Sequence, residues 1–68
     1  MSIYLIRVGS EVEQYEFDGR DAAIETLLDV SDPTGLSGGR LCYLYSLNES
    51  GGRIEVALAR NGELISHL

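Results

Sequence analysis

Two turn signals constrain the fold of this chain more than any other feature of its sequence. Asn61-Gly62 separates two runs of alternating apolar residues and is typical of a two-residue type I′ hairpin. Gly9-Ser10 follows a run of β-branched and aromatic residues and is typical of a type II′ hairpin. Each turn therefore predicts a pair of antiparallel strands. These strands are residues 3–8 with 11–17, and residues 53–60 with 63–68.

A helix is predicted after the second strand, at residues 20–30. Four apolar residues recur there at helical spacing: Ala23, Ile24, Leu27 and Leu28. Asp18 precedes the helix, so its side chain is expected to cap the free amides, with Asp21 completing a capping box. Pro33 ends the helix because the residue before a proline disfavours helical backbone geometry.

Residues 40–47 show the alternation of a strand and complete the predicted order ββαβββ. This order indicates an α+β fold, a small antiparallel sheet of four or five strands with one amphipathic helix packed on one face. The glutamates of residues 11–17 favour an edge strand, because charge discourages further pairing. One helix cannot cover such a sheet entirely, so one face should expose apolar residues. The candidates for that face are Tyr43, Tyr45, Leu64, Ile3 and Leu5.

The type I′ turn also predicts the register of the last hairpin. The expected partners are Arg60 with Glu63, Leu58 with Ile65, and Val56 with His67. In this register the aliphatic residues of both strands lie on one side of the sheet.

The length of 68 residues and the net charge of −6 limit the classes of protein to which the chain can belong. A chain this short buries only about 60% of the surface that it exposes when unfolded, so one small domain without a cofactor-binding fold is expected. Cys42 is the only cysteine, which excludes an internal disulfide and a cysteine-based zinc cluster. A small domain without such links is typical of a reducing environment, and the cytoplasm is the expected compartment.

Contact with a membrane is not expected. No apolar run approaches the roughly 18 residues that are needed to span a bilayer. Residues 1–10 lack both the basic start and the cleavage pattern of a signal peptide, and they are predicted to contain a strand instead.

Acidic residues are concentrated in one third of the chain. Residues 11–32 contain eight carboxylates and one arginine, whereas residues 33–68 are neutral overall. Four of these acids recur along one side of the predicted helix and form an acidic ridge: Asp21, Glu25, Asp29 and Asp32. No cation four residues along neutralises them, and such like charges repel by a few tenths of a kcal/mol per pair. Local stability therefore does not explain the ridge.

Two interpretations of the acidic ridge are open. It is either a solvated face that keeps a small protein soluble or an electronegative surface that docks on a basic partner protein. DNA mimicry is a special case of docking, but one charge per 5.4 Å helical turn is sparse beside one per roughly 1.7 Å of duplex DNA. A mimic would also need the glutamates of the second strand, Glu11, Glu13 and Glu16. Direct binding of nucleic acid is not expected, because the negative charge repels phosphate and the sequence has no basic stripe.

No pattern in the sequence indicates an enzyme, a cofactor or a metal site. His67 is the only histidine and lies at a strand end, while Cys42 is expected to be a small core residue. Residues 18–21 lack the ligand spacing of a calcium loop, and capping explains both aspartates. Residues 35–39 are rich in glycine but follow a helix and lack the Gly-Lys-Ser/Thr ending of a phosphate-binding loop.

The chain resembles the small acidic anti-CRISPR proteins that bacteriophages use against type I CRISPR systems. The resemblance lies in the small size, the excess acid of residues 11–32, and the layout of one helix on a short antiparallel sheet. The order of the elements is similar along the whole chain, and the resemblance includes no diagnostic motif. It implies a stoichiometric inhibitor in the host cytoplasm that binds a CRISPR effector complex and blocks DNA recognition. The residues that match this role are the acidic ridge with Glu11, Glu13 and Glu16, whereas the neutral C-terminal half departs from a uniformly DNA-like charge.

The alternative is a small interaction or assembly module, antitoxin-like or dimerising, that binds through its sheet face. An exposed apolar sheet face on a small protein is typical of a partner surface or a homodimer. Tyr43 and Tyr45 would be its anchors, because tyrosine is enriched at binding hot spots. Binding through this face is expected to depend weakly on salt, in contrast to binding through the acidic ridge.

Overall fold

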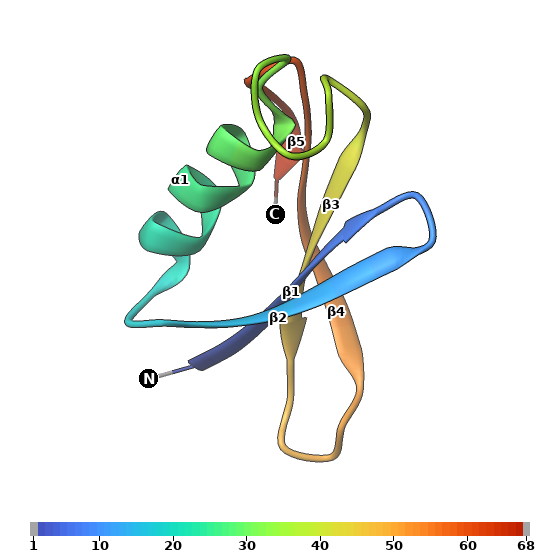
Figure 1. Ribbon diagram of the computed structural model, residues 1–68. Helices are drawn as coiled ribbons and strands as arrows, with labels where there is room; N and C mark the ends of the chain where they lie inside the picture. Colours follow the sequence, from blue (N-terminus) through green and yellow to red (C-terminus); the bar gives the residue numbers. More distant parts are fainter. Residues whose placement is uncertain (1, 68) are drawn as a thin grey trace.

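Residues 2–67, which the computed structural model describes, form one helix and one five-stranded antiparallel sheet (Figure 1). In chain order the elements are β1 (Ser2–Val8), β2 (Glu11–Phe17), α1 (Arg20–Ser31), β3 (Cys42–Leu47), β4 (Arg53–Arg60) and β5 (Glu63–His67). The strand order in the sheet is β2-β1-β3-β4-β5. The predicted α+β fold and its ββαβββ order are confirmed, while the predicted end of the last strand at residue 68 lies outside the described residues. Within the described part, no helix is long and apolar enough to cross a membrane.

Both predicted two-residue turns are present, because their residues adopt the backbone angles that each turn type needs. Gly9 has a φ of 63°, the only positive φ in the turn between β1 and β2, as in a type II′ hairpin. Asn61 and Gly62 have φ of 54° and 77°, and Arg60 pairs with Glu63, as in a type I′ hairpin. β2 is an edge strand, as its glutamates predicted.

The helix α1 begins and ends close to the predicted residues, but its start is capped differently. Gly19, in extended backbone, occupies the N-cap position, and no described side chain makes a capping hydrogen bond. The predicted cap at Asp18 is wrong, since Asp18 lies one residue outside the N-cap. Asp21 lies in the first turn, where its charge favours the helix dipole. At the other end Asp32 is the C-cap, with a ψ of 140° that suits the residue before Pro33.

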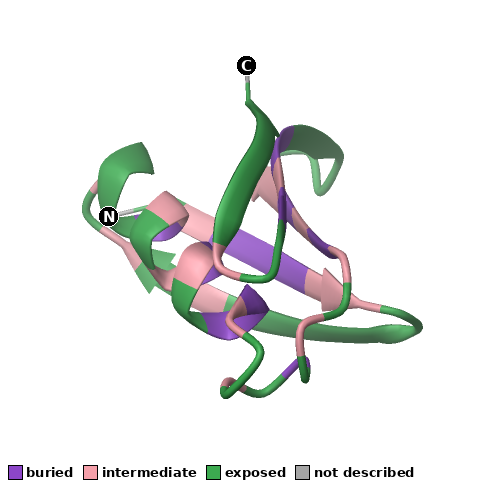
Figure 2. Ribbon diagram, turned by 90° about the horizontal axis from the view of Figure 1, so that it is seen from above, coloured by how far each residue is buried: buried purple, intermediate pink, exposed green. Residues whose placement is uncertain are grey.

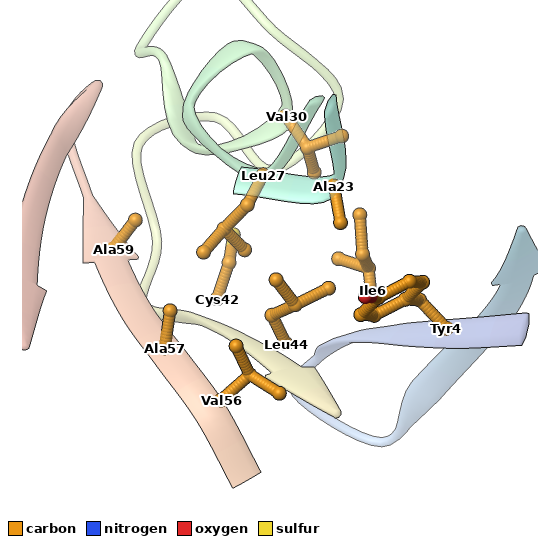
Figure 3. Packing of buried hydrophobic residues seen from close by; sticks show 10 residues of the cluster. All are labelled: Tyr4, Ile6, Ala23, Leu27, Val30, Cys42, Leu44, Val56, Ala57 and Ala59. Carbon is orange, nitrogen blue, oxygen red and sulfur yellow. The ribbon is translucent and has the colours of Figure 1, made fainter. Parts of the chain in front are cut away.

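The core lies between α1 and one face of the sheet. Leu27 of α1 packs with Leu44 and Cys42 of the central strand β3, and all three are fully buried (Figure 3). The edge strands β2 and β5 are mostly exposed (Figure 2). The Gly62 N–H donates to both the Oγ and the carbonyl oxygen of Ser31, at 3.1 Å each. This contact ties the turn between β4 and β5 to the end of α1.

A β-bulge in β4 changes which of its side chains reach the core. Val56 is an extra residue on this strand, at the point where the register with β3 shifts between Leu44 and Tyr45. As a result the consecutive residues Val56 and Ala57 are both buried in the core, and Leu58 lies on the opposite face. The prediction that the aliphatic residues of β4 share one side is wrong, because the inserted residue reverses the alternation.

A second bulge lies in β5, where Ile65 has no partner in the register with β4. Leu58 pairs with Ser66 instead, and Ala57 pairs with His67. Both pairs that were predicted beyond the turn are therefore wrong. The turn fixes the first two pairs of the hairpin, Arg60 with Glu63 and Ala59 with Leu64, and the extra residue shifts every later one.

The face of the sheet opposite α1 is open, because no described element lies against it (Figure 1). Side chains alternate along a strand, so the residues between the core positions of β1 and β3 lie on this open face. Its members on β1, β3 and β4 include Ile3, Leu5, Arg7, Tyr43, Tyr45 and Leu58. Leu5 is nevertheless buried, so it does not contribute to the exposed apolar surface that was predicted for this face. Leu64 pairs instead with Ala59, whose side chain belongs to the core.

Candidate interaction surfaces

Three of the four members of the acidic ridge form a solvent-exposed row on α1. Asp21, Glu25 and Asp29 are exposed and follow one another at intervals of four residues. Asp29 lies near the C-terminal end of α1, where the helix dipole disfavours negative charge, and the last turn contains no basic residue. Within residues 2–67, no carboxylate forms an ion pair with Arg7, Arg40, Arg53 or Arg60.

Asp32, the fourth member of the acidic ridge, has a structural role in the loop after the helix. Its Oδ1 accepts hydrogen bonds from the Thr34 backbone N–H at 2.9 Å and from the Thr34 hydroxyl at 2.6 Å. The hydroxyl bond, followed by the backbone bond, lowers the pKa of Asp32 below its ordinary value. The carboxylate therefore holds the chain where it leaves α1.

We expect Asp32→Asn to reduce the free energy of unfolding at neutral pH and to lose this effect in acid. Folding lowers the pKa of Asp32, so its carboxylate adds to the free energy of unfolding. This stabilisation is fully present above the pKa of the unfolded chain, near 4, and is lost as the pH falls through the lower pKa of the folded protein. Urea denaturation of both proteins between pH 2 and pH 7 would measure the difference. Thr34→Val, which removes the hydroxyl donor, should reproduce part of it. A difference that is constant over this pH range would contradict the assignment.

The glutamates of β2 are divided between the two faces of the sheet. Glu13 pairs with the core residue Ile6, so Glu13 and Glu11 lie on the side of the sheet that carries α1. Glu16 pairs with Ile3 and lies on the open face. The structure therefore brings only Glu11 and Glu13 to the same side of the sheet as the acidic ridge.

A small cavity separates these glutamates from the end of α1. Its volume is about 60 Å³, and Glu13, Val30, Leu36 and Arg40 are among the residues that line it. Pockets for drug-sized ligands are typically several hundred Å³ in volume. This cavity has room for a few water molecules and not for a cofactor.

Tyr43 and Tyr45, the other predicted site residues, lie side by side on the open face. Their rings stack with centroids 6.3 Å apart and planes inclined by 7°. The guanidinium carbon of Arg7 lies 4.0 Å from the centre of the Tyr43 ring, and that of Arg53 lies 5.8 Å from the centre of the Tyr45 ring. Arg7 Nε also donates a hydrogen bond to the Tyr45 hydroxyl at 3.3 Å. This hydrogen bond is the main cause that raises the pKa of Arg7 above its ordinary value.

Three arginines that line a hollow beside Tyr43 are functional candidates that the sequence did not predict. Arg7, Arg40 and Arg60 line one shallow hollow on the open face, together with Tyr43. In the sequence they are dispersed and form no basic stripe. Pairing of β1 with β3 and of β3 with β4 brings them together.

The two residues that were considered for catalysis are not neighbours in the sheet. Cys42 on β3 pairs with β4, whereas His67 lies on β5, on the far side of β4. Cys42 is buried, and its Sγ lies 3.3 Å from the Arg40 carbonyl oxygen. Among residues 2–67 there is no group of three histidines, cysteines or carboxylates that could hold a metal ion.

No known protein family, curated protein or solved structure matches this chain. A function must therefore be inferred from the two surfaces of the molecule. One is the acidic ridge with Glu11 and Glu13, and the other is the open face with its tyrosines and arginines.

Proposed function

We propose that this chain is a non-enzymatic inhibitor that binds the basic surface of a partner protein through its acidic ridge. Following its resemblance to anti-CRISPR proteins, the proposed partner is a type I CRISPR effector complex, and the proposed effect is a block of DNA recognition. The observation that carries the proposal is the exposed row of Asp21, Glu25 and Asp29, which the sheet arginines do not neutralise.

The cost of this row to the helix supports the proposal. Each pair of carboxylates four residues apart repels by a few tenths of a kcal/mol. Asp29 adds an unfavourable interaction with the helix dipole, whereas Asp21 at the first turn gains a favourable one. If the charged row served only to keep the protein soluble, a basic residue at position 25 or 29 would do so equally well. It would also stabilise the helix by attracting the carboxylate four residues away. A basic partner surface supplies the positive charge that the arginines of the sheet do not bring to this row.

The carboxylates of α1 and β2 together match a DNA-recognising surface better than the row on α1 does alone. Consecutive carboxylates of the exposed row Asp21, Glu25 and Asp29 are four residues apart, about 6 Å along the helix axis, so the row is less dense than the phosphates of DNA. Glu11 and Glu13 add charge on the same side of the sheet. Asp32 and Glu16 contribute less, because Asp32 is bound to Thr34 and Glu16 lies on the opposite face.

Charge reversal with a matched control tests the proposal. The variant carries Asp21→Lys, Glu25→Lys and Asp29→Lys, and the control carries Glu49→Lys, Glu55→Lys and Glu63→Lys. Both change the net charge from −6 to zero, but only the first changes the acidic ridge. The readout is target-DNA binding by a purified type I effector complex as the inhibitor concentration is increased, at low and at high salt.

We expect the wild-type chain and the control to inhibit DNA binding, less strongly at high salt, and the ridge variant to lose at least about tenfold in affinity. Circular dichroism would show that each variant remains folded. Equal inhibition by the ridge variant would show that the acidic ridge is not the interface. Absence of inhibition by the wild-type chain would overturn the proposed partner.

The second candidate function is an assembly module whose open face pairs with a second copy of the chain. The observation that favours it is the stacked pair Tyr43 and Tyr45 on a face that no described element covers. Sedimentation equilibrium distinguishes the two functions. A dimer that weakens in Tyr45→Ala and is indifferent to salt would support assembly, whereas a monomer at all concentrations would exclude it.

A further inference from the structure

A group of arginines on the open face points to a ligand site that is separate from the acidic ridge. We infer that Arg7, Arg40 and Arg60 form a binding site for a diphosphate group. The three side chains line one shallow hollow, although the chain contains only five basic residues and has a net charge of −6. Positive charge is therefore concentrated at one place on an otherwise acidic protein.

Two of the guanidinium groups lie beside Gly9, in the turn between β1 and β2. Arg7 Nη1 donates a hydrogen bond to the Gly9 carbonyl oxygen at 2.7 Å. Arg40 Nη1 lies only 3.6 Å from the position that a Cβ atom would occupy on Gly9. Arg60 reaches the same hollow from β4, on the other side of β3.

The contacts that hold these arginines leave donor groups available for a ligand. Arg7 is fixed by its bonds to Gly9 and Tyr45 and by the Tyr43 ring, and its Nη2 group makes no hydrogen bond within the described residues. Arg40 uses its Nε to donate to the Ser37 carbonyl oxygen at 3.1 Å, which leaves both terminal nitrogens. Arg40 can therefore offer a phosphate two parallel N–H donors, one from each terminal nitrogen, and Arg7 can offer its Nη2 group.

No carboxylate within residues 2–67 forms an ion pair with the three arginines of the hollow, although Arg40 also lines the cavity that Glu11 and Glu13 border. Glu63 is the cross-strand partner of Arg60, yet the two form no ion pair. Like charges that converge without a counter-ion repel one another, so an anion is the missing partner. The acidic ridge lies on the other side of the sheet, and at physiological salt charges are largely screened beyond about 8 Å. The net charge of the chain therefore does not prevent an anion from binding here.

The width of the hollow favours a diphosphate over a single phosphate. Arg7 and Arg60 lie on β1 and β4, which are separated by β3 and thus by two inter-strand spacings of about 4.8 Å each. An extended anion with two charged groups can reach guanidinium groups on both sides. Because Arg7 already covers the Tyr43 ring, we expect no stacking of a nucleobase on that ring.

Titration of the full chain with pyrophosphate, inorganic phosphate and adenosine diphosphate, followed by amide NMR shifts, tests the inference. Arg60→Gln is the main variant, since its guanidinium makes no hydrogen bond within the described residues and its loss should not disturb packing. Arg7→Gln is the second variant. Arg53→Gln is the matched control, because Arg53 contacts Tyr45 on the same face but lies outside the hollow.

We expect pyrophosphate to shift the amides of the hollow and to bind at least about tenfold more weakly to Arg60→Gln and Arg7→Gln, with Arg53→Gln unchanged. Adenosine diphosphate should bind like pyrophosphate if the site recognises only the two phosphates, and more tightly if a nucleotide is the source of the group. Absence of shifts in the hollow, or equal weakening in Arg53→Gln, would overturn the inference. The outcome of this titration does not affect the proposal for the acidic ridge, which is tested separately by charge reversal.

Discussion

Leu44→Ala is expected to lower the free energy of unfolding by about 2–5 kcal/mol. Leu44 is 0% exposed and lies at the centre of the sheet, between Ile6 of β1 and Ala57 of β4 (Figure 3). Backbone pairing holds both neighbouring strands in place, so the core cannot easily collapse into the space that the side chain leaves. A chain of 68 residues has a total stability of only about 3–10 kcal/mol, and the loss is therefore a large fraction of it.

Thermal and urea denaturation of Leu44→Ala would measure this effect. A fall in Tm of about 10 °C or more is expected, because 1 kcal/mol corresponds to about 4–8 °C in a domain of this size. Leu36→Ala is the matched control, since it makes the same chemical change at a side chain that is 82% exposed. Its expected effect is within about 0.5 kcal/mol. Similar losses in the two variants would contradict the description of the core.

Gly35→Ala is expected to destabilise the protein by about 3 kcal/mol, through the loop that follows α1. A Cβ atom at this position would overlap the carbonyl oxygen of Asp29 and lie 3.1 Å from the carbonyl oxygens of Val30 and Asp32. These are backbone atoms of the helix end, so they cannot rotate away as a side chain would. The expected cost is at the upper end of the range for overpacked sites, which corresponds to a fall in Tm of about 12–24 °C.

Gly38→Ala in the same loop distinguishes the effect of steric overlap from that of an unfavourable backbone angle. A Cβ atom at Gly38 would meet nothing within 4 Å, although its φ of 65° disfavours a side chain. We expect a loss of about 1 kcal/mol from this conformational strain alone. If Gly38→Ala proved as damaging as Gly35→Ala in urea denaturation, the contacts at the end of α1 would not be the cause.

The features of this fold that depend on neighbours in the chain could be predicted from the sequence. The two turns, the edge position of β2 and the extent of α1 follow from residues within a few positions of one another. The prediction at Asp18 was wrong although α1 begins at Arg20 as expected, because the N-cap is then Gly19 and Asp18 lies one residue before it. The sequence also did not distinguish Asp32 from the rest of the acidic ridge, since its hydrogen bonds to Thr34 depend on the path of the loop.

The residues by themselves therefore determined the elements of this protein, their order and the concentration of acid on α1 and β2. Only the tertiary structure decided which face α1 covers, where the bulges in β4 and β5 lie, and that Arg7 meets Tyr45. These last two residues are 38 positions apart in the chain. Propensity and spacing act over one turn of helix or one hairpin. The pairing of β1 with β3, and the packing of α1 over them, depends on the burial of apolar surface by the whole chain at once.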